Sequence, residues 1–102
     1  MIRYSFQQTN GTIKQVIIIG HASYSQKNNI VCSSVSTAII VSLNAIEIFG
    51  LKNKVFFRLR KGYFKLDVLE TDVIINNLLK NLQYTLKDLS KSFCLYLKEK
   101  DS

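Results

Sequence analysis

The hydrophobic and polar positions of this chain follow two patterns, strict alternation and a three-four spacing, and together they divide it into about six elements. Residues 2–7 alternate between apolar and polar side chains, as in a half-buried strand, and the turn dipeptide Asn10-Gly11 follows. Residues 12–19 predict the returning strand. Its last part, 16–19, is apolar on both faces and β-branched, which is typical of an interior strand. The first two elements are therefore a β-hairpin that ends at Gly20.

A helix is expected next, over residues 30–49, because apolar side chains recur there with helical spacing. Asn29 is a suitable N-cap, and Gly50 is a suitable stop. The most apolar window, 38–49, is shorter than the roughly 18–20 residues needed to cross a bilayer. It therefore predicts a buried helix, and we expect no membrane partner.

A second hairpin and a long closing helix account for the rest of the chain. Residues 55–60 and 64–68 alternate on either side of a turn at Lys61-Gly62. Thr71-Asp72 offers a helix start, and apolar residues keep a three-four spacing from there to Tyr96. The order ββαββα predicts an α+β fold of two layers, with a mostly antiparallel four-stranded sheet and both helices on one face.

Composition favours one ordinary globular domain. A length of 102 residues is that of a small domain, so we expect residues 1–102 to form a single one. With 47% hydrophobic and 21% charged residues, the chain lacks the signature of disorder. Cys32 and Cys94 have no partners at zinc-ligand spacing, and we expect no metal and no cofactor. The N-terminus has no secretory pattern, so the expected location is the reducing cytoplasm.

Positive charge is concentrated in one stretch of the chain. The formal net charge is +7, and a segment free of carboxylates holds six cations: Lys52, Lys54, Arg58, Arg60, Lys61 and Lys65. Such an excess suggests an anionic partner such as RNA or the ribosome. Strand alternation would also send several of these charges to a plain solvated face. Both interpretations stay open at this point.

Candidate chemistry lies where the first hairpin meets the first helix. The one histidine of the chain, His21, follows the strand end, and Cys32 would fall in the first helical turn if Asn29 is the cap. A cysteine at a helix start beside a histidine is a recurring nucleophile. Spacing alone also allows a small core cysteine and a polar loop histidine. Cys94, on the closing helix, is expected to be structural.

The amino-acid sequence of this junction resembles a known family signature. Gly20-His21-Ala22, a polar loop and Ile30-Val31-Cys32-Ser33-Ser34-Val35-Ser36 resemble the Gly-His-Ala … Asp-Ile-Val-Cys-Ala-Ala-Val-Ser pattern of the ribosomal-processing cysteine proteases, the Prp family. The strict resemblance spans residues 20–36, and the chain length and the order of elements are also similar to those of the family.

This resemblance implies an endopeptidase that removes the N-terminal extension of a large-subunit ribosomal protein, the twenty-seventh, with His21 and Cys32 as a catalytic dyad. Cleavage beside an aromatic pair, and hence an apolar pocket, is implied too, as is a homodimer. By motif position the expected substrate-binding or supporting residues are Gly20, Ala22, Asn29 and Ser36. We expect N–H groups at the helix start, that of Cys32 included, to form an oxyanion hole.

Two departures and one rival interpretation accompany the resemblance. Asn29 stands where the family pattern has Asp, and Ser33-Ser34 stands where it has Ala-Ala. Loss of the acid leaves room for a non-catalytic assembly factor that binds the ribosome or RNA through the basic stretch 52–65. Because that stretch belongs to the second hairpin, we expect it to lie apart from the dyad and not to affect cleavage of a short peptide.

Overall fold

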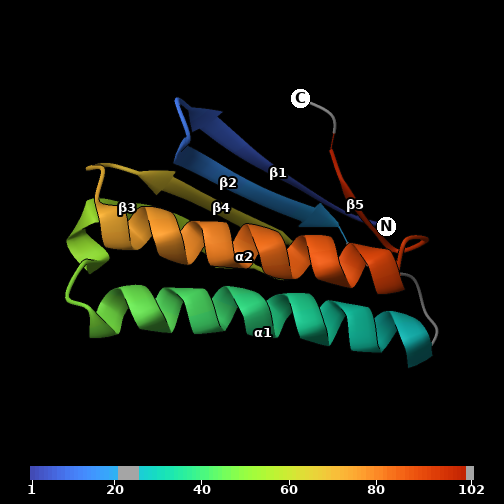
Figure 1. The fold of residues 1–102 in the computed structure, drawn as a ribbon. Helices are drawn as coiled ribbons and strands as arrows, with labels where there is room; N and C mark the ends of the chain where they lie inside the picture. The colour runs from blue at the N-terminus through green and yellow to red at the C-terminus, as the bar shows by residue number, and fades with distance from the viewer. Residues whose placement is uncertain (21–25, 101–102) are drawn as a thin grey trace.

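The chain folds into a sheet covered on one face by two long helices (Figure 1). A computed structural model describes residues 1–20 and 26–100, with the side chains of 26–28 left out, so His21 and Ala22 lie outside the described residues. The elements are β1 (Ile2–Thr9), β2 (Thr12–Gly20), α1 (Gln26–Ile48), the short 3-10 helix η1 (Lys52–Lys54), β3 (Val55–Arg60), β4 (Tyr63–Val68), α2 (Val73–Ser92) and β5 (Leu97–Glu99).

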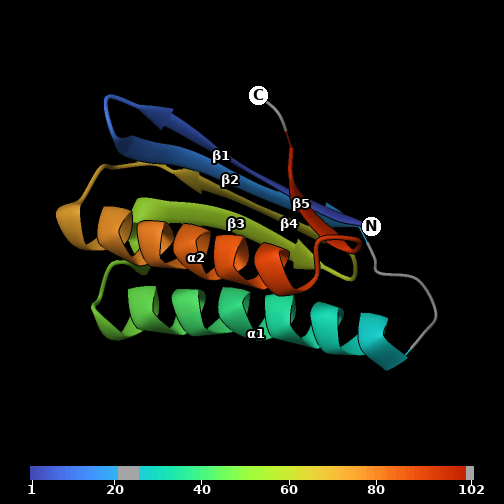
Figure 2. The ribbon, with the colours of Figure 1, turned by 45° about the vertical axis from the view of Figure 1, so that its right-hand side comes forward.

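The sheet is mixed but mostly antiparallel, with the strand order β3-β4-β2-β1-β5. Both predicted hairpins are present, and β2 pairs with β1 on one side and with β4 on the other. This confirms the prediction, made from its apolar residues on both faces, that β2 is an interior strand. Figure 2 shows α1 and α2 side by side beneath the same face, so the two-layer α+β arrangement is confirmed.

Within the described residues the sheet has five strands, however, and the prediction of four was wrong. The closing helix ends at Ser92, four residues before the predicted end at Tyr96, and β5 then runs parallel to β1. The N–H of Ile2 donates to the C=O of Tyr96 at 2.8 Å. Without β5, β1 would be an edge strand with unpaired backbone groups. Pairing satisfies that edge and buries Leu97 completely, which favours a strand over further helix.

Helix α1 also differs from its predicted bounds. It is already helical at Gln26, so Asn29 lies inside it and is not its N-cap. Its inner face is buried, whereas Val41 and Ile48 are exposed, so the prediction of a buried helix holds for one face only. Residues 29–48 are long and apolar enough to cross a membrane by length and composition, a test that core helices of globular proteins also pass.

The core lies between the helices and the inner face of the sheet. Asp72 caps α2 as predicted, since its carboxylate accepts hydrogen bonds from the N–H groups of Ile74 and Ile75. The same carboxylate pairs with Lys54 at 3.0 Å, which joins η1 to the start of α2. The side chains with no more than 1% exposure include Tyr4, Ile13, Val16, Val31, Ile46, Phe64, Leu66, Ile75, Leu79, Leu82, Leu86 and Leu97. Truncating one such aliphatic side chain to Ala costs about 2–5 kcal/mol.

Candidate active site

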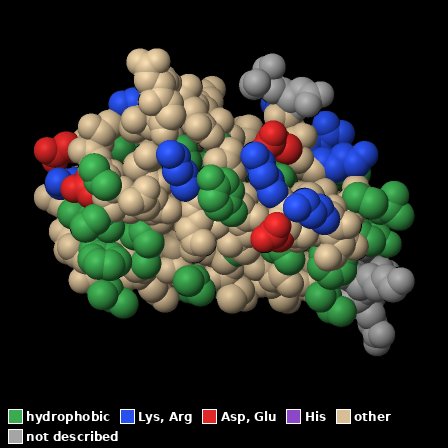
Figure 3. Space-filling view, in the orientation of Figure 1, with side chains coloured by type: hydrophobic (Ala, Val, Ile, Leu, Met, Phe, Trp, Pro, Cys, Tyr) green, Lys and Arg blue, Asp and Glu red, His purple; other side chains and the backbone are tan. Residues whose placement is uncertain are grey.

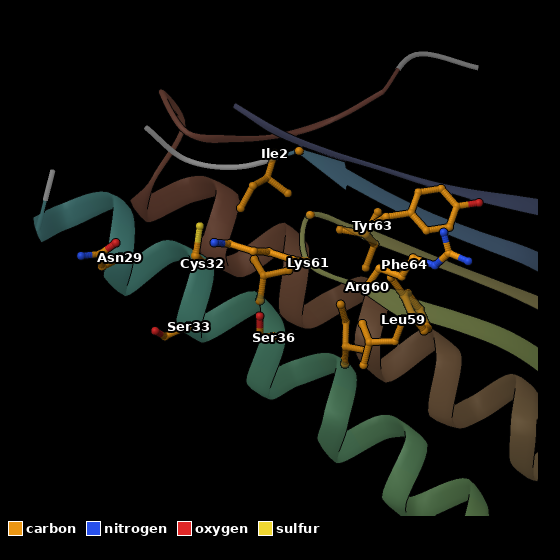
Figure 4. A pocket seen from close by; sticks show the side chains of 15 residues that line it. Ile2, Asn29, Cys32, Ser33, Ser36, Leu59, Arg60, Lys61, Tyr63 and Phe64 are labelled. Atoms are coloured by element: carbon orange, nitrogen blue, oxygen red, sulfur yellow. The ribbon is translucent and has the colours of Figure 1, made fainter. Parts of the chain in front are cut away.

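A cavity of about 720 Å³ opens between the N-terminal part of α1, the end of β2 and the β3–β4 turn (Figure 4). Its apolar lining comes from both layers: Ile2, Ile18, Val35, Ile39, Leu59 and Phe64. The volume falls within the range of roughly 300–1,000 Å³ that is usual for ligand sites. The implied apolar pocket is therefore present next to the candidate cysteine.

One face of α1 contributes the polar lining. Asn29, Cys32, Ser33 and Ser36 all line the cavity, because residues three and four apart share a helical face. Cys32 carries a free thiol and is half-buried. Gly20, from the end of β2, completes the group. Four of the six expected site residues thus meet at one cavity, and the other two, His21 and Ala22, lie outside the described residues.

The position of Cys32 within α1 changes one part of the expected chemistry. Since α1 is helical from Gln26, Cys32 stands in its second turn and not in its first. Helical N–H groups beyond the first turn donate to the C=O four residues earlier, so the N–H of Cys32 belongs to the helical ladder. The expectation that this N–H helps to form an oxyanion hole was wrong.

The hydroxyl of Ser36 makes no hydrogen bond within the described part of the chain. Ser34 and Ser42 each donate back to a helical C=O, at 2.8 Å to Ile30 and at 2.9 Å to Ala38. Ser36 makes no such bond, and its side chain lines the cavity one turn beyond Cys32. The hydroxyl is therefore free to bind a ligand there.

Gly20 holds the wall of the cavity in place through its backbone. Its φ of +117° lies where side chains are rarely tolerated, and a Cβ at this position would run into the carbonyl oxygen of Met1. Its N–H donates to the C=O of Gly62 at 3.0 Å, which fastens the β3–β4 turn to the end of β2. Glycine is required here, immediately before His21 in the chain.

The β3–β4 turn brings two cations to the cavity that sequence reasoning had placed elsewhere. Arg60 and Lys61 both line it, so the expected separation of the basic stretch from the site was wrong for these two residues. In Figure 4 the ammonium end of Lys61 points toward Cys32, whereas the Arg60 side chain extends toward Tyr63. No Asp or Glu of the described ranges lines this cavity.

A signal for this arrangement existed in the sequence. An interior strand needs two neighbours, and pairing the apolar end of β2 with the second hairpin puts Ile19 opposite Tyr63 and the turn beside Gly20.

Two further observations concern the other cysteine and possible metal ligands. Cys94 is exposed in the turn after α2, and not on a helix as expected, and it does not line the cavity. Residues 1–20 and 26–100 contain no group of three potential metal ligands.

Solved structures with a similar fold include proteins from two bacteria. The chain is 20% identical to the Staphylococcus aureus ribosomal processing protease Prp in complex with a substrate peptide, with a TM-score of 0.84 and 98% of each chain covered. The same protease with a covalently linked product peptide is 22% identical, with a TM-score of 0.82, over 98% of this chain and 100% of the other. SMU.848 from Streptococcus mutans is 23% identical, with a TM-score of 0.78, over 98% and 92%.

These likenesses show a shared fold. No curated protein matches the chain. The family model for the cysteine protease Prp, in contrast, matches residues 1–98, nearly the whole length and every element that lines the cavity. The chain therefore belongs to the Prp family of cysteine proteases.

Proposed function

We propose that this protease removes the N-terminal extension of a large-subunit ribosomal protein, the twenty-seventh, and that His21 and Cys32 form its catalytic dyad. One observation carries the assignment of the nucleophile: the half-buried, free thiol of Cys32 lines the apolar cavity together with Gly20, the residue covalently bonded to His21. Peptides are bound to the Staphylococcus aureus relative, which supports a peptide substrate here.

The proposed reaction is nucleophilic catalysis. The thiolate of Cys32 attacks the scissile carbonyl carbon, and the C=O π electrons move to oxygen. When this tetrahedral intermediate collapses, the C–N bond breaks, the imidazolium of His21 protonates the leaving amine, and a thioester on Cys32 remains. Water, deprotonated by His21, then hydrolyses the thioester and releases the acid. No cofactor enters any of these steps.

The cavity fits the substrate implied by the family resemblance. An aromatic pair beside the scissile bond would bury its rings against Ile18, Ile39 and Phe64. The free hydroxyl of Ser36 and the side chain of Asn29 would hydrogen-bond to the peptide backbone. The ammonium end of Lys61 points toward Cys32 and would stabilise an oxyanion that develops there. Binding of the apolar side chains would therefore present the scissile carbonyl to Cys32.

Two further parts of the proposal concern location and assembly. Because ribosomal proteins and ribosomes are cytoplasmic, we place the enzyme there. For the homodimer we propose a contact along the outward strip of α1, where Ile30, Val41 and Ile48 are 55%, 57% and 83% exposed. An exposed apolar strip of this kind is typical of an interaction surface. Sedimentation equilibrium of Val41→Lys should then give a monomer, and an unchanged dimer would exclude this strip.

The decisive experiment incubates the purified protein with the unprocessed ribosomal protein and measures the product masses. The wild type should release one N-terminal fragment. Cys32→Ala should release none, and Cys94→Ala, which alters an exposed thiol outside the cavity, should remain active. His21→Ala should be nearly inactive. Cleavage by Cys32→Ala would contradict the dyad, whereas inactivity of every protein would favour the rival assembly factor.

A further inference from the structure

No helix or strand among residues 1–20 and 26–100 covers the face of the sheet opposite the helices (Figures 1 and 2), and strand pairing gathers cations on this face. Residues that alternate with the buried positions of each strand point to this side. Among the described residues on this side are the cations Arg3, Arg58, Arg60, Lys65 and Lys98 and the carboxylate Asp67. Only part of this surface comes from the basic stretch 52–65, because Arg3 is contributed by β1 and Lys98 by β5.

The registers place these residues in two adjacent rows across the strands. In the first row Arg60 pairs with Tyr63, Tyr63 with Ile19, Ile19 with Arg3, and Arg3 with Lys98, one residue from each strand. Four strand spacings of about 4.8 Å make this row roughly 19 Å long. The second row sets Arg58 directly beside Lys65.

These five cations have no carboxylate partner among the residues that the structure describes. The ion pairs are Lys54–Asp72 and Lys91–Asp88, neither of which lies on this face. Asp67 instead accepts a hydrogen bond of 2.7 Å from the side chain of Gln15. Unpaired like charges in neighbouring positions repel one another, so the folded protein bears a cost that a bound polyanion would relieve.

Aromatic rings lie among these charges. Phe56 is 51% exposed, and the guanidinium of Arg58 stands 5.9 Å from the centre of its ring. Tyr63 lies within the first row. The helical side in Figure 3 has a different character, because Lys and Arg side chains there are interspersed with Asp and Glu. Cations and flat rings on an open sheet are the combination that holds phosphates and stacks unpaired bases.

We propose that this outer sheet face binds single-stranded RNA, a function separate from peptide cleavage. Its cations would contact successive phosphates, and Phe56 and Tyr63 would stack against bases. The first row ends at Arg60 and Tyr63, which also line the active-site cavity, so RNA bound along it would reach the edge of that cavity. The protease would thereby engage its protein substrate while both are held on RNA.

The test is fluorescence anisotropy with a labelled single-stranded RNA dodecamer at 50 and 200 mM salt. The triple variant Arg3→Gln, Arg58→Gln, Lys65→Gln should bind at least about tenfold more weakly, and its salt slope should fall by about 2, since each phosphate contact contributes roughly 0.7. The control, Lys80→Gln, Lys87→Gln, Lys91→Gln on α2, removes the same charge and should stay within about threefold of the wild type.

Further measurements separate the RNA surface from general charge and from damage to the fold. Phe56→Ser should weaken RNA binding severalfold and leave inorganic polyphosphate binding unchanged. Both triple variants should keep wild-type peptide cleavage, because none of their residues lines the cavity. Equal losses in the two triples, equal binding of polyphosphate and RNA, or no RNA binding by the wild type would overturn the proposal.

Discussion

The N–H of Gly20 donates to the C=O of Gly62, and this single bond of 3.0 Å joins the end of β2 to the turn that carries Lys61. Through it the first hairpin, the second hairpin and α1 surround one cavity. The chemistry suggested by the residues around Gly20 and Cys32 therefore depends on a pairing between segments about forty residues apart in the sequence.

Gly20→Ala should destabilise the protein by about 1–3 kcal/mol, because the new Cβ adds a steric conflict with Met1 to an unfavourable φ. Urea unfolding monitored by circular dichroism measures the change. Gly11→Ala is the matched control, since its φ is also positive but open space surrounds it, and its loss should be the smaller of the two. Equal losses would mean that the Met1 contact is unimportant.

Lys61→Gln should lower kcat/KM for an aromatic-containing peptide on the order of tenfold, because the Cys32 N–H is engaged in the helix and the Lys61 cation, which points toward Cys32 in the same cavity, is left to stabilise the oxyanion. Lys65→Gln makes the same charge change on the outer face of the same hairpin and should leave turnover unchanged. Identical kinetics for the two variants would exclude a role for Lys61 in the reaction.

Asn29→Asp, which restores the residue of the family pattern, should keep or raise the cleavage rate. In the early part of α1 a carboxylate interacts favourably with the helix dipole, by about 0.3–1 kcal/mol. The opposing effect is electrostatic, because a carboxylate three residues before Cys32 on the same helical face disfavours the Cys32 thiolate. Peptide turnover at pH 7 shows which of these two effects is larger. A marked fall in turnover would show that the new carboxylate disfavours the Cys32 thiolate.

Asp72→Asn should reduce the amount by which the free energy of unfolding falls between pH 7 and pH 3. The hydrogen bond from Lys54, followed by those from the N–H groups of Ile74 and Ile75, lowers the pKa of Asp72 below its ordinary value. Its contribution is therefore complete above the unfolded pKa of about 3.9 and disappears as the pH falls through the lower folded value. Urea midpoints at pH 7 and pH 3 measure this difference, and Asp88→Asn, on the surface of α2, should behave like the wild type.

Local patterns were sufficient for most elements and failed where distant segments compete. The alternation in 2–7 and the apolar run in 16–19 determine β1 and β2 directly. The last residues continue a helical spacing as far as Tyr96, and only the unpaired edge of β1 makes a strand the better outcome for Leu97. In α1 a good capping residue suggested a start at Asn29, yet the residues before it, Gln26 and Lys27, are themselves good helix formers.

The residues of the candidate site also fall into two groups, those placed by local helical spacing and those placed by pairing with a distant segment. Helical spacing alone places Asn29, Cys32 and Ser36 on one face, and the structure agrees. Lys61 reaches this face only through the pairing of β2 with β4, which no local pattern encodes. Residues that share an element with Cys32 follow directly from helical spacing, whereas those contributed by the other hairpin follow only once the second neighbour of the interior strand β2 is identified.

The parallel pairing of β5 with β1 also bears on how the protein is made. Ile2, which lines the cavity, is held by backbone bonds to a segment translated after both helices. A nascent chain that still has β5 inside the ribosomal exit tunnel cannot form this contact, the one with the greatest sequence separation in the sheet and therefore among the slowest to close. Assembly of the active-site wall therefore waits until β5 has left the tunnel, after both helices have done so, and a growing chain lacks the finished cavity until then.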